Sequence, residues 1–400
     1  LIDIPHLILQ VGVDGYGVIA VAQVVMFYLW VFTDYSFNQS ATRSITLHRT
    51  DPLAVSHIFS RVFVTRLVLC VLAFLLLVML VILVPLFRNH LRLYCMAFTF
   101  VVGQSLLMNW FFLGLERMHY ITFVTLVARV LFALLVFIFI NDRSDGYLFL
   151  FFLGTGNIVA GLLSLVIAFR VYQLSFIRPA VADILLELKQ GWQITLSHVL
   201  NSSCHYTNIF ILRFFAGDLV VGYYGIAERI FFTIKQVFVV FSQAVYPKVC
   251  QLVQEGKESA ISFLKQTYGS FLLLVIMGCL ALFIFSPQVL YFFTGSGYGN
   301  AVFYLRAFCI IAVIVCLNIP GTLILLALDQ KRPYLKVYAL AVVLNISLNI
   351  ILARMYQANG TIVAIFVTEF FIAMGLTRMI YRAGPIKQRW ISDPPDNMGY

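Results

Sequence analysis

Residues 67–84 read LVLCVLAFLLLVMLVILV, eighteen apolar residues in a row without a charge or a turn-forming residue. A helix of roughly 20 such residues spans the hydrocarbon core of a bilayer. The same rule predicts spans at 18–39, 63–87, 93–115, 120–140, 147–169, 192–213, 219–245, 268–292, 301–327, 335–353 and 360–381. The apolar stretch 1–11 reads as the tail of one further helix whose beginning is missing. We therefore expect an all-α polytopic membrane protein with about twelve transmembrane helices, the first one truncated.

The composition of the whole chain agrees with lipid as its main solvent. Hydrophobic residues make up 62% of the 400 residues and charged residues 11%, against roughly 25% charged residues in a typical globular domain. A soluble fold cannot bury so much apolar surface. The seven cysteines include no C-x-x-C pair, so no disulfide framework or zinc site is indicated. Soluble, secreted and disordered classes are excluded.

The basic residues predict the orientation of the chain. Of the 27 Lys and Arg residues, 18 fall in one set of alternate loops, with Arg66 and Arg117 among them, and five fall in the other set. Cytoplasmic loops carry the excess of Lys and Arg. We therefore expect a cytoplasmic carboxyl terminus. The net charge of +10 is explained by this asymmetry, and no nucleic acid partner is expected.

A weak internal repeat relates the two halves. Arg117-Met-His-Tyr120 recurs as Lys331-Arg-Pro-Tyr334, and Asp145-Gly146 corresponds to Asn359-Gly360 at the same separation along the sequence. Six spans per half in the same direction form a parallel repeat, as in many secondary transporters. The predicted division is an amino-terminal lobe over 1–170, a cytoplasmic linker over 171–190, a carboxy-terminal lobe over 191–382 and a cytoplasmic tail over 383–400.

Ionisable residues inside the spans are candidates for a substrate cavity, because they are costly in lipid and usually mark a pathway. They are Arg129, Arg229, Lys235, Arg306, Asp34, Glu228 and Glu369. Four cations against three acids suit an anionic substrate. The alternative is that these residues form ion pairs between helices, and that Arg306 reaches the membrane surface.

Span 192–213 carries one polar stripe at steps of three and four residues: His198, Asn201, Ser202, His205 and Asn208. A polar face on a membrane helix cannot contact lipid. It lines a water-filled cavity or forms hydrogen bonds between helices. The histidines are too far apart to bind one metal ion. In another span, Pro320-Gly321 should kink or break the helix.

Several motifs resemble those of Wzx-type polysaccharide flippases, which belong to the multidrug/oligosaccharidyl-lipid/polysaccharide exporter superfamily. They are GYG at 15–17 with Gln23, TDYSFNQSATR at 33–43, WFFLGLERM at 110–118, VGYYGIAER at 221–229 and YPK at 246–248. The resemblance covers essentially the whole chain. Ser36, Gln39 and Leu113 replace the usual Gly, Leu and Gln of the family pattern.

The resemblance implies two six-helix lobes around a central cavity. It also implies flipping of undecaprenyl-pyrophosphate-linked oligosaccharide repeat units across the bacterial inner membrane, for O-antigen and lipopolysaccharide biosynthesis. It adds Gln23, Asn38 and Arg43 to the expected cavity residues. The expected partners are the lipid-linked oligosaccharide, membrane lipid and other polysaccharide-assembly proteins, and no cofactor is expected.

Two alternatives remain open from the sequence. A cation-coupled multidrug antiporter of the same superfamily is expected to carry an acidic cavity, and the cationic excess argues against it. An integral-membrane glycosyltransferase or polymerase needs a catalytic loop with paired acids or a metal site. The short loops of this chain argue against such an enzyme. The sequence also contains no G-x-x-x-x-G-K-[ST] motif, so we expect no ATP-driven transporter domain in this chain.

Overall fold

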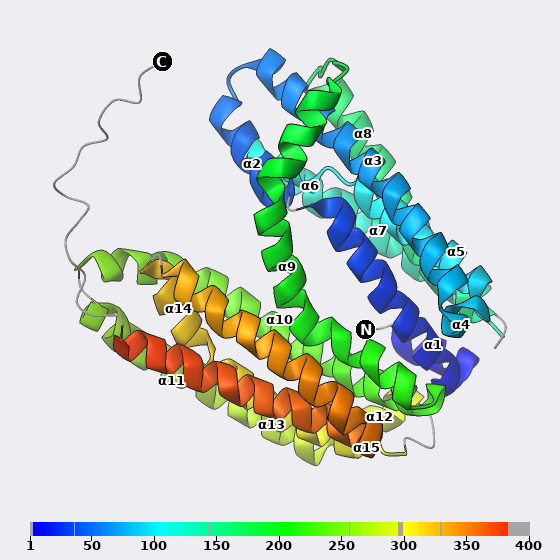
Figure 1. Ribbon diagram of the computed structural model, residues 1–400, viewed down its shortest axis with the longest axis vertical. Coiled ribbons are helices and arrows are strands. Elements are labelled where there is room, and N and C mark those ends of the chain that lie inside the picture. Colours follow the sequence, from blue (N-terminus) through cyan, green and yellow to red (C-terminus); the bar gives the residue numbers. More distant parts are fainter. Residues whose placement is uncertain are drawn as a thin grey trace. The chain divides into compact units, whose positions relative to one another are not determined.

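The computed structural model describes residues 3–35, 37–142, 145–255, 257–294, 299–328 and 330–382, and every regular element in them is an α-helix (Figure 1). The chain forms two compact units. Unit 1 comprises Leu1–Gly225 with Leu290–Tyr298, and unit 2 comprises Ile226–Val289 with Gly299–Tyr400. These units have other bounds than the predicted lobes, linker and tail, and that division stays a prediction.

Eight helical segments of the described chain are long and apolar enough to cross a membrane, fewer than the eleven expected spans. One of them, Pro333–Met379, has 47 residues and overlaps two of the predicted spans. The non-helical residue Gln357 divides it into two helices, each of which has the roughly 20 residues that span the hydrocarbon core. The predicted spans 192–213 and 219–245 lie in helices that are not among the eight.

Unit 1 contains nine helices of the described chain and the start of a tenth. They are α1 (Asp3–Asp34), α2 (Phe37–His48), α3 (Pro52–Leu83), α4 (Pro85–Arg88), α5 (Leu91–Leu106), α6 (Asn109–Gly114), α7 (Met118–Phe139), α8 (Gly146–Val171), α9 (Val181–Phe215) and the first residues of α10 (Asp218–Glu255). Helix α8 packs along α5 and α7, and α1 packs against α5, α9 and α3.

Helix α1 is divided by a kink at Gly12, whose φ of 84° lies in the left-handed region. Glycine reaches that region without a steric penalty. The kink separates residues 3–11, the predicted helix tail, from residues 13–34. Helix α3 begins where Asp51 accepts hydrogen bonds from the backbone nitrogens of Leu53 and Ala54, with Pro52 at the first helical position.

Unit 2 contains the rest of α10, followed by α11 (Lys257–Ile284), the start of α12 (Ser286–Thr294), α13 (Ala301–Leu317), α14 (Ile319–Ala327) and α15 (Lys331–Arg382). The predicted break at Pro320-Gly321 is confirmed, because α13 ends and α14 begins with Pro320 in its first turn. Helix α15 is kinked at Gln357, which has a φ of 50°. This kink falls beside Asn359-Gly360, a pair of residues that favours turns.

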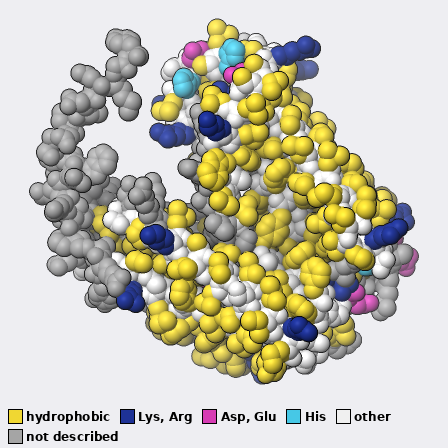
Figure 2. All heavy atoms as spheres, in the orientation of Figure 1, with side chains coloured by type: hydrophobic (Ala, Val, Ile, Leu, Met, Phe, Trp, Pro, Cys, Tyr) yellow, Lys and Arg dark blue, Asp and Glu magenta, His cyan; other side chains and the backbone are white. Residues whose placement is uncertain are grey.

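The outer faces of the helices are apolar. On α3, exposed large hydrophobic side chains run from Leu67 to Leu83. In the view of Figure 2, hydrophobic side chains cover much of the described surface, and Lys and Arg side chains appear only as separate small groups. Such a surface requires lipid around it.

Candidate functional site

The most deeply buried charge of unit 1 is Arg66, in the middle of α3. Its side chain is 2% exposed, and one of its terminal nitrogens lies 3.2 Å from the Oδ1 atom of Asp34. The guanidinium also donates to the carbonyl oxygens of Leu107, at 2.8 Å, and Gln104, at 2.9 Å. These carbonyls end α5, where the helix leaves its last oxygens unpaired and partly negative. Arg66 therefore joins α1, α3 and the end of α5 through one charge.

Asp34 is positioned by the turn between α1 and α2. Helix α1 ends at Asp34, Tyr35 adopts a φ of 43°, and α2 begins at Phe37. The Nδ2 atom of Asn38 donates to the Oδ1 atom of Asp34 at 2.9 Å. The Tyr35 hydroxyl donates to the carbonyl oxygen of Leu188 in α9 at 2.9 Å, and burial raises the pKa of this hydroxyl. The hydroxyl is therefore a neutral donor.

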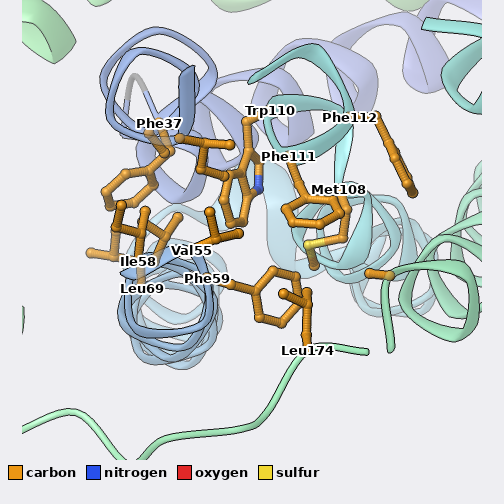
Figure 3. Close-up of a cluster of buried hydrophobic side chains, with 14 residues drawn as sticks. Phe37, Val55, Ile58, Phe59, Leu69, Met108, Trp110, Phe111, Phe112 and Leu174 are labelled. Atoms are coloured by element: carbon orange, nitrogen blue, oxygen red, sulfur yellow. The ribbon is translucent and has the colours of Figure 1, made fainter. Parts of the chain in front are cut away.

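Two of the sequence motifs, at 33–43 and 110–118, pack against each other. The Thr42 hydroxyl lies 3.1 Å from the carbonyl oxygen of Trp110, and the Thr46 hydroxyl 3.1 Å from that of Gly114. Phe37 of α2 joins Trp110 of α6 in a buried apolar cluster. Figure 3 shows its side chains converging from α2, α3 and α6. Most of the apolar residues in these motifs thus belong to one core with apolar residues of α3.

Unit 2 carries its own buried charge at the α13–α14 break. Glu369 of α15 is 6% exposed, and its Oε2 atom accepts a hydrogen bond of 3.0 Å from Asn318, the residue between α13 and α14. Lys235 of α10 interacts electrostatically with this carboxylate. Its ammonium lies 5.5 Å and 5.9 Å from the ring centroids of Phe231 and Phe232. Lys235 is half-buried.

The predicted cavity residues of unit 1 fall into three groups. Gln23, Asp34 and Asn38 are half-buried, and Asn208 is buried. Arg43 and Arg129 are exposed, and Arg129 lies on α7 between the exposed apolar residues Leu126 and Val130. The side chains of His198, Asn201, Ser202 and His205 lie outside the residues that the structure describes, so the polar stripe stays a prediction.

The predicted cavity residues of unit 2 also differ in exposure. Arg229 is exposed, whereas the neighbouring Glu228 is buried. Arg306 is half-buried; its Nε atom donates to the carbonyl oxygen of Phe283 at 3.2 Å and to the Ser286 hydroxyl at 3.0 Å. These contacts tie α13 to the end of α11 and the start of α12. The site roles of all these residues stay predictions.

Sequence reasoning missed Arg66, which it counted among the cytoplasmic loop residues. The predicted span 63–87 places this residue near the membrane edge, whereas α3 begins eleven residues earlier, at Pro52. A search for charges flanking an apolar run could not identify it, because its partners lie on α1 and α5. Among the described residues, no group of three or more His, Cys, Asp and Glu could hold a metal ion.

Residues 4–253 match the family model of the polysaccharide biosynthesis proteins. The chain belongs to this family. An O-antigen transporter of Escherichia coli (strain K12) is 25% identical over 380 residues, which cover 93% of the chain and 90% of that protein. The matched region contains the motifs at 15–17, 33–43, 110–118 and 221–229.

Solved structures show the fold of this polysaccharide biosynthesis family member. A multidrug resistance transporter of the MATE family, in its inward-facing conformation, superposes with a TM-score of 0.76 at 14% identity and covers 96% of this chain and 94% of its own. The lipid II flippase MurJ superposes with a TM-score of 0.57 at 13% identity, covering 92% and 87%. The chain is thus an all-helical, multi-pass membrane protein with a MATE-like fold.

Proposed function

We propose that this protein is a transporter, not an enzyme, that flips undecaprenyl-pyrophosphate-linked oligosaccharide repeat units across the bacterial inner membrane for O-antigen biosynthesis. The observation that carries the proposal is the family match over residues 4–253. It is supported by the 25% identity to an O-antigen transporter over nearly the full length of both chains. The MATE-like fold alone does not select this function, since both a multidrug transporter and a lipid II flippase share it.

The substrate's chemistry fits the charges of the chain. A pyrophosphate requires cations that it can reach, and an oligosaccharide requires polar side chains. Arg129 and Arg229 are exposed, so each can meet an anion directly. Lys235 is half-buried and would exchange its interaction with Glu369 for one with the substrate. Arg66 is different, because its guanidinium is already bound by Asp34 and two carbonyl oxygens. We assign substrate contact to Arg129, Arg229 and Lys235, and a structural role to Arg66.

The proposed architecture is twelve helices in two six-helix lobes around a central cavity, with the carboxyl terminus in the cytoplasm. Its support is the order of elements within each unit. In unit 1 a long helix, α3, is followed by a short helix, a broken helix (α5 and α6) and a helix pair (α7 and α8). In unit 2 the long helix α11 is followed by the same series, ending in the two parts of α15. A duplicated ancestral unit explains this order.

A cation-coupled multidrug antiporter is the remaining alternative within the superfamily. It requires acids that a cationic drug can reach. The carboxylates of Glu228 and Glu369 are buried, and Asp34 is bound by Arg66 and Asn38. The exposed charges of the candidate set are cations, which argues for an anionic substrate.

Complementation tests the proposal. The chain, expressed in a bacterial strain that lacks its own O-antigen transporter and makes a matching repeat unit, should restore surface polysaccharide. Arg129→Ala and Lys235→Ala should abolish export at near-normal protein abundance in the membrane, and Arg129→Lys should retain part of it. Arg170→Ala, which removes an exposed cation at the end of α8, is the control. Normal export by both alanine variants would show that these cations do not bind the substrate. Drug resistance without restored surface polysaccharide would favour the antiporter.

A further inference from the structure

The non-helical segment between α8 and α9, residues 172–180, is bound along α3, and we call it the strap. The backbone nitrogen of Ser175 donates to the hydroxyl of Ser56 at 3.3 Å. The backbone nitrogen of Ile177 donates to the hydroxyl of Ser60 at 3.0 Å, one helical turn farther along α3. These two hydrogen bonds fix the strap on α3, within unit 1, and thereby set the place where α9 begins.

The strap lies at the depth of lipid headgroups. Exposed large hydrophobic side chains run along α3 from Leu67 to Leu83, over about 24 Å at roughly 1.5 Å per residue. A hydrocarbon core of roughly 30 Å therefore begins about 3 Å before Leu67, and a headgroup layer of about 5–8 Å lies outside it. Ser60 is about 10 Å before Leu67 along the helix, which places the carboxyl end of the strap in this layer. In the predicted orientation, the layer belongs to the cytoplasmic leaflet.

The acids and the cations at this end of unit 1 are used differently. The acids are engaged within the fold, in ion pairs or with backbone nitrogens at the starts of helices; they are Asp51, Glu116, Asp183 and Glu187. Five cations at the same end have exposed side chains and no ion pair among the described residues; they are Arg43, Arg117, Arg170, Arg178 and Lys189. This end of unit 1 thus presents positive charge that attracts anionic lipids.

Apolar side chains lie beside two of these cations in the sequence. Phe176 of the strap is 50% exposed, and Val181 and Leu185 at the start of α9 are 72% and 62% exposed. Val181, Leu185 and Lys189 follow one another at steps of four residues, so they share one face of α9. We call Phe176, Arg178, Val181, Leu185 and Lys189 the strap surface. Basic residues combined with exposed apolar side chains are typical of segments that lie in the membrane interface.

This combination favours a lipid over a soluble partner. An acidic protein would neutralise the cations, whereas an anionic phospholipid offers phosphates and acyl chains side by side at the depth of the strap. We propose that the strap surface binds the headgroups of anionic phospholipids in the cytoplasmic leaflet, with phosphates at Arg178 and Lys189 and the Phe176 ring at the edge of the acyl chains. The bound lipid holds the strap on α3. None of the cations assigned to the substrate belongs to this surface, so the binding does not depend on transport.

Lipid binding by the purified full chain in detergent tests the proposal. Fluorescent phosphatidylglycerol should bind at least tenfold more tightly than phosphatidylcholine with the same chains. Arg178→Gln should weaken this binding about fivefold, the loss expected for one cation beside an anionic lipid surface, and Arg178→Lys should bind within twofold of the wild type. Arg88→Gln is the control, because it removes an exposed cation beyond the other end of α3. It should also bind within twofold.

Three results would overturn the proposal. Equal affinity for the two lipids would leave the strap surface to an acidic protein partner. An equal loss in Arg88→Gln and Arg178→Gln would mean that any surface cation attracts the lipid. Unchanged phosphatidylglycerol affinity after Arg178→Gln and Lys189→Gln are combined would place the lipid elsewhere on the protein.

Hydrogen exchange in the wild-type protein covers the case in which the variants do not accumulate in the membrane. Phosphatidylglycerol should slow exchange of the strap amides, which include the Ile177 N–H bound by Ser60, at least threefold relative to phosphatidylcholine. Equal exchange in the two lipids would contradict the proposal. If phosphatidylglycerol protects the strap of a protein that flips no saccharide, the proposed function fails and the lipid site stands.

Discussion

The two broken helices of this protein, α5–α6 in unit 1 and α13–α14 in unit 2, reach the same shape by different means. Both follow a long helix, α3 or α11, that supplies a hydrogen-bond donor to a carbonyl oxygen at the break. In unit 1 the donor is the charged Arg66, which binds the oxygens of Gln104 and Leu107. In unit 2 it is the neutral hydroxyl of Tyr268, which donates to the carbonyl oxygen of Cys316.

The difference explains why only one break could be read from the sequence. Pro320 lacks a backbone N–H and clashes with the preceding turn, so it interrupts a helix by itself. The break after Leu106 has no proline or glycine in residues 104–109, and it depends on a side chain forty residues away. The α13–α14 break is caused locally by a proline, whereas the α5–α6 break depends on a tertiary interaction. The predictions below test this contrast, starting with the largest expected effect.

Arg66→Ala should destabilise the protein most. It leaves the Asp34 carboxylate and two carbonyl oxygens without their cation, and removing one partner of a buried ion pair costs about 3–5 kcal/mol. Thermal unfolding in detergent should show a large drop in Tm, and membrane abundance should fall. Arg49→Ala is the control, because both side chains of its pair with Glu116 are exposed, at 54% and 67%, and the pair should contribute about 1 kcal/mol or less. Equal stability of the two variants would mean that Arg66 does not hold the break.

Tyr268→Phe should have an intermediate effect. It removes a neutral donor and leaves a buried carbonyl oxygen unpaired, at a cost of about 1–3 kcal/mol. The same Tm measurement applies, with Tyr291→Phe as the control, since that side chain is 61% exposed. A loss as large as that of Arg66→Ala would show that the two breaks do not differ in the way described.

Glu369→Gln should change stability least. Glutamine keeps an oxygen that can accept the hydrogen bond from Asn318, and half-buried Lys235 can be solvated when the carboxylate charge is gone. The expected loss is about 1 kcal/mol, the value of a typical hydrogen bond. Tm in detergent should fall by a few degrees or less, with Glu116→Gln, at 67% exposure, as the control. A collapse of the protein would instead make Glu369 the counterpart of Arg66.

Much of the architecture follows from the sequence. Apolar runs located most of the helices, and the break at Pro320-Gly321 occurs where it was expected. The ends of helices were less predictable. The predicted span 18–39 continues through Asp34, where the chain leaves α1 and starts α2. The first three residues of α2, 37–39, fall within that expected span, because hydropathy averages do not register a single residue with positive φ, here Tyr35.

The candidate site was predictable as chemistry but not as geometry. Polar residue types inside spans identified Asp34, Lys235 and Glu369, and the structure gives each of them a partner. Arg66 was missed because helix length, not hydropathy, decides how deep a residue lies. Sequence spacing also cannot tell that Arg129 is exposed on α7 whereas Glu228 is buried on α10. Those differences depend on which neighbouring helix covers each face.

The central claim is that this protein moves a lipid-linked saccharide across a bilayer, and reconstitution tests it most directly. Purified protein is incorporated into vesicles that contain undecaprenyl-pyrophosphate-linked oligosaccharide in both leaflets. A glycosidase that cannot cross the membrane is then added outside. The account predicts that protein-containing vesicles expose nearly all of the saccharide to the enzyme. Vesicles with Lys235→Ala should expose only the outer half. Cleavage that stops at half with the wild-type protein, as in protein-free vesicles, would contradict the account.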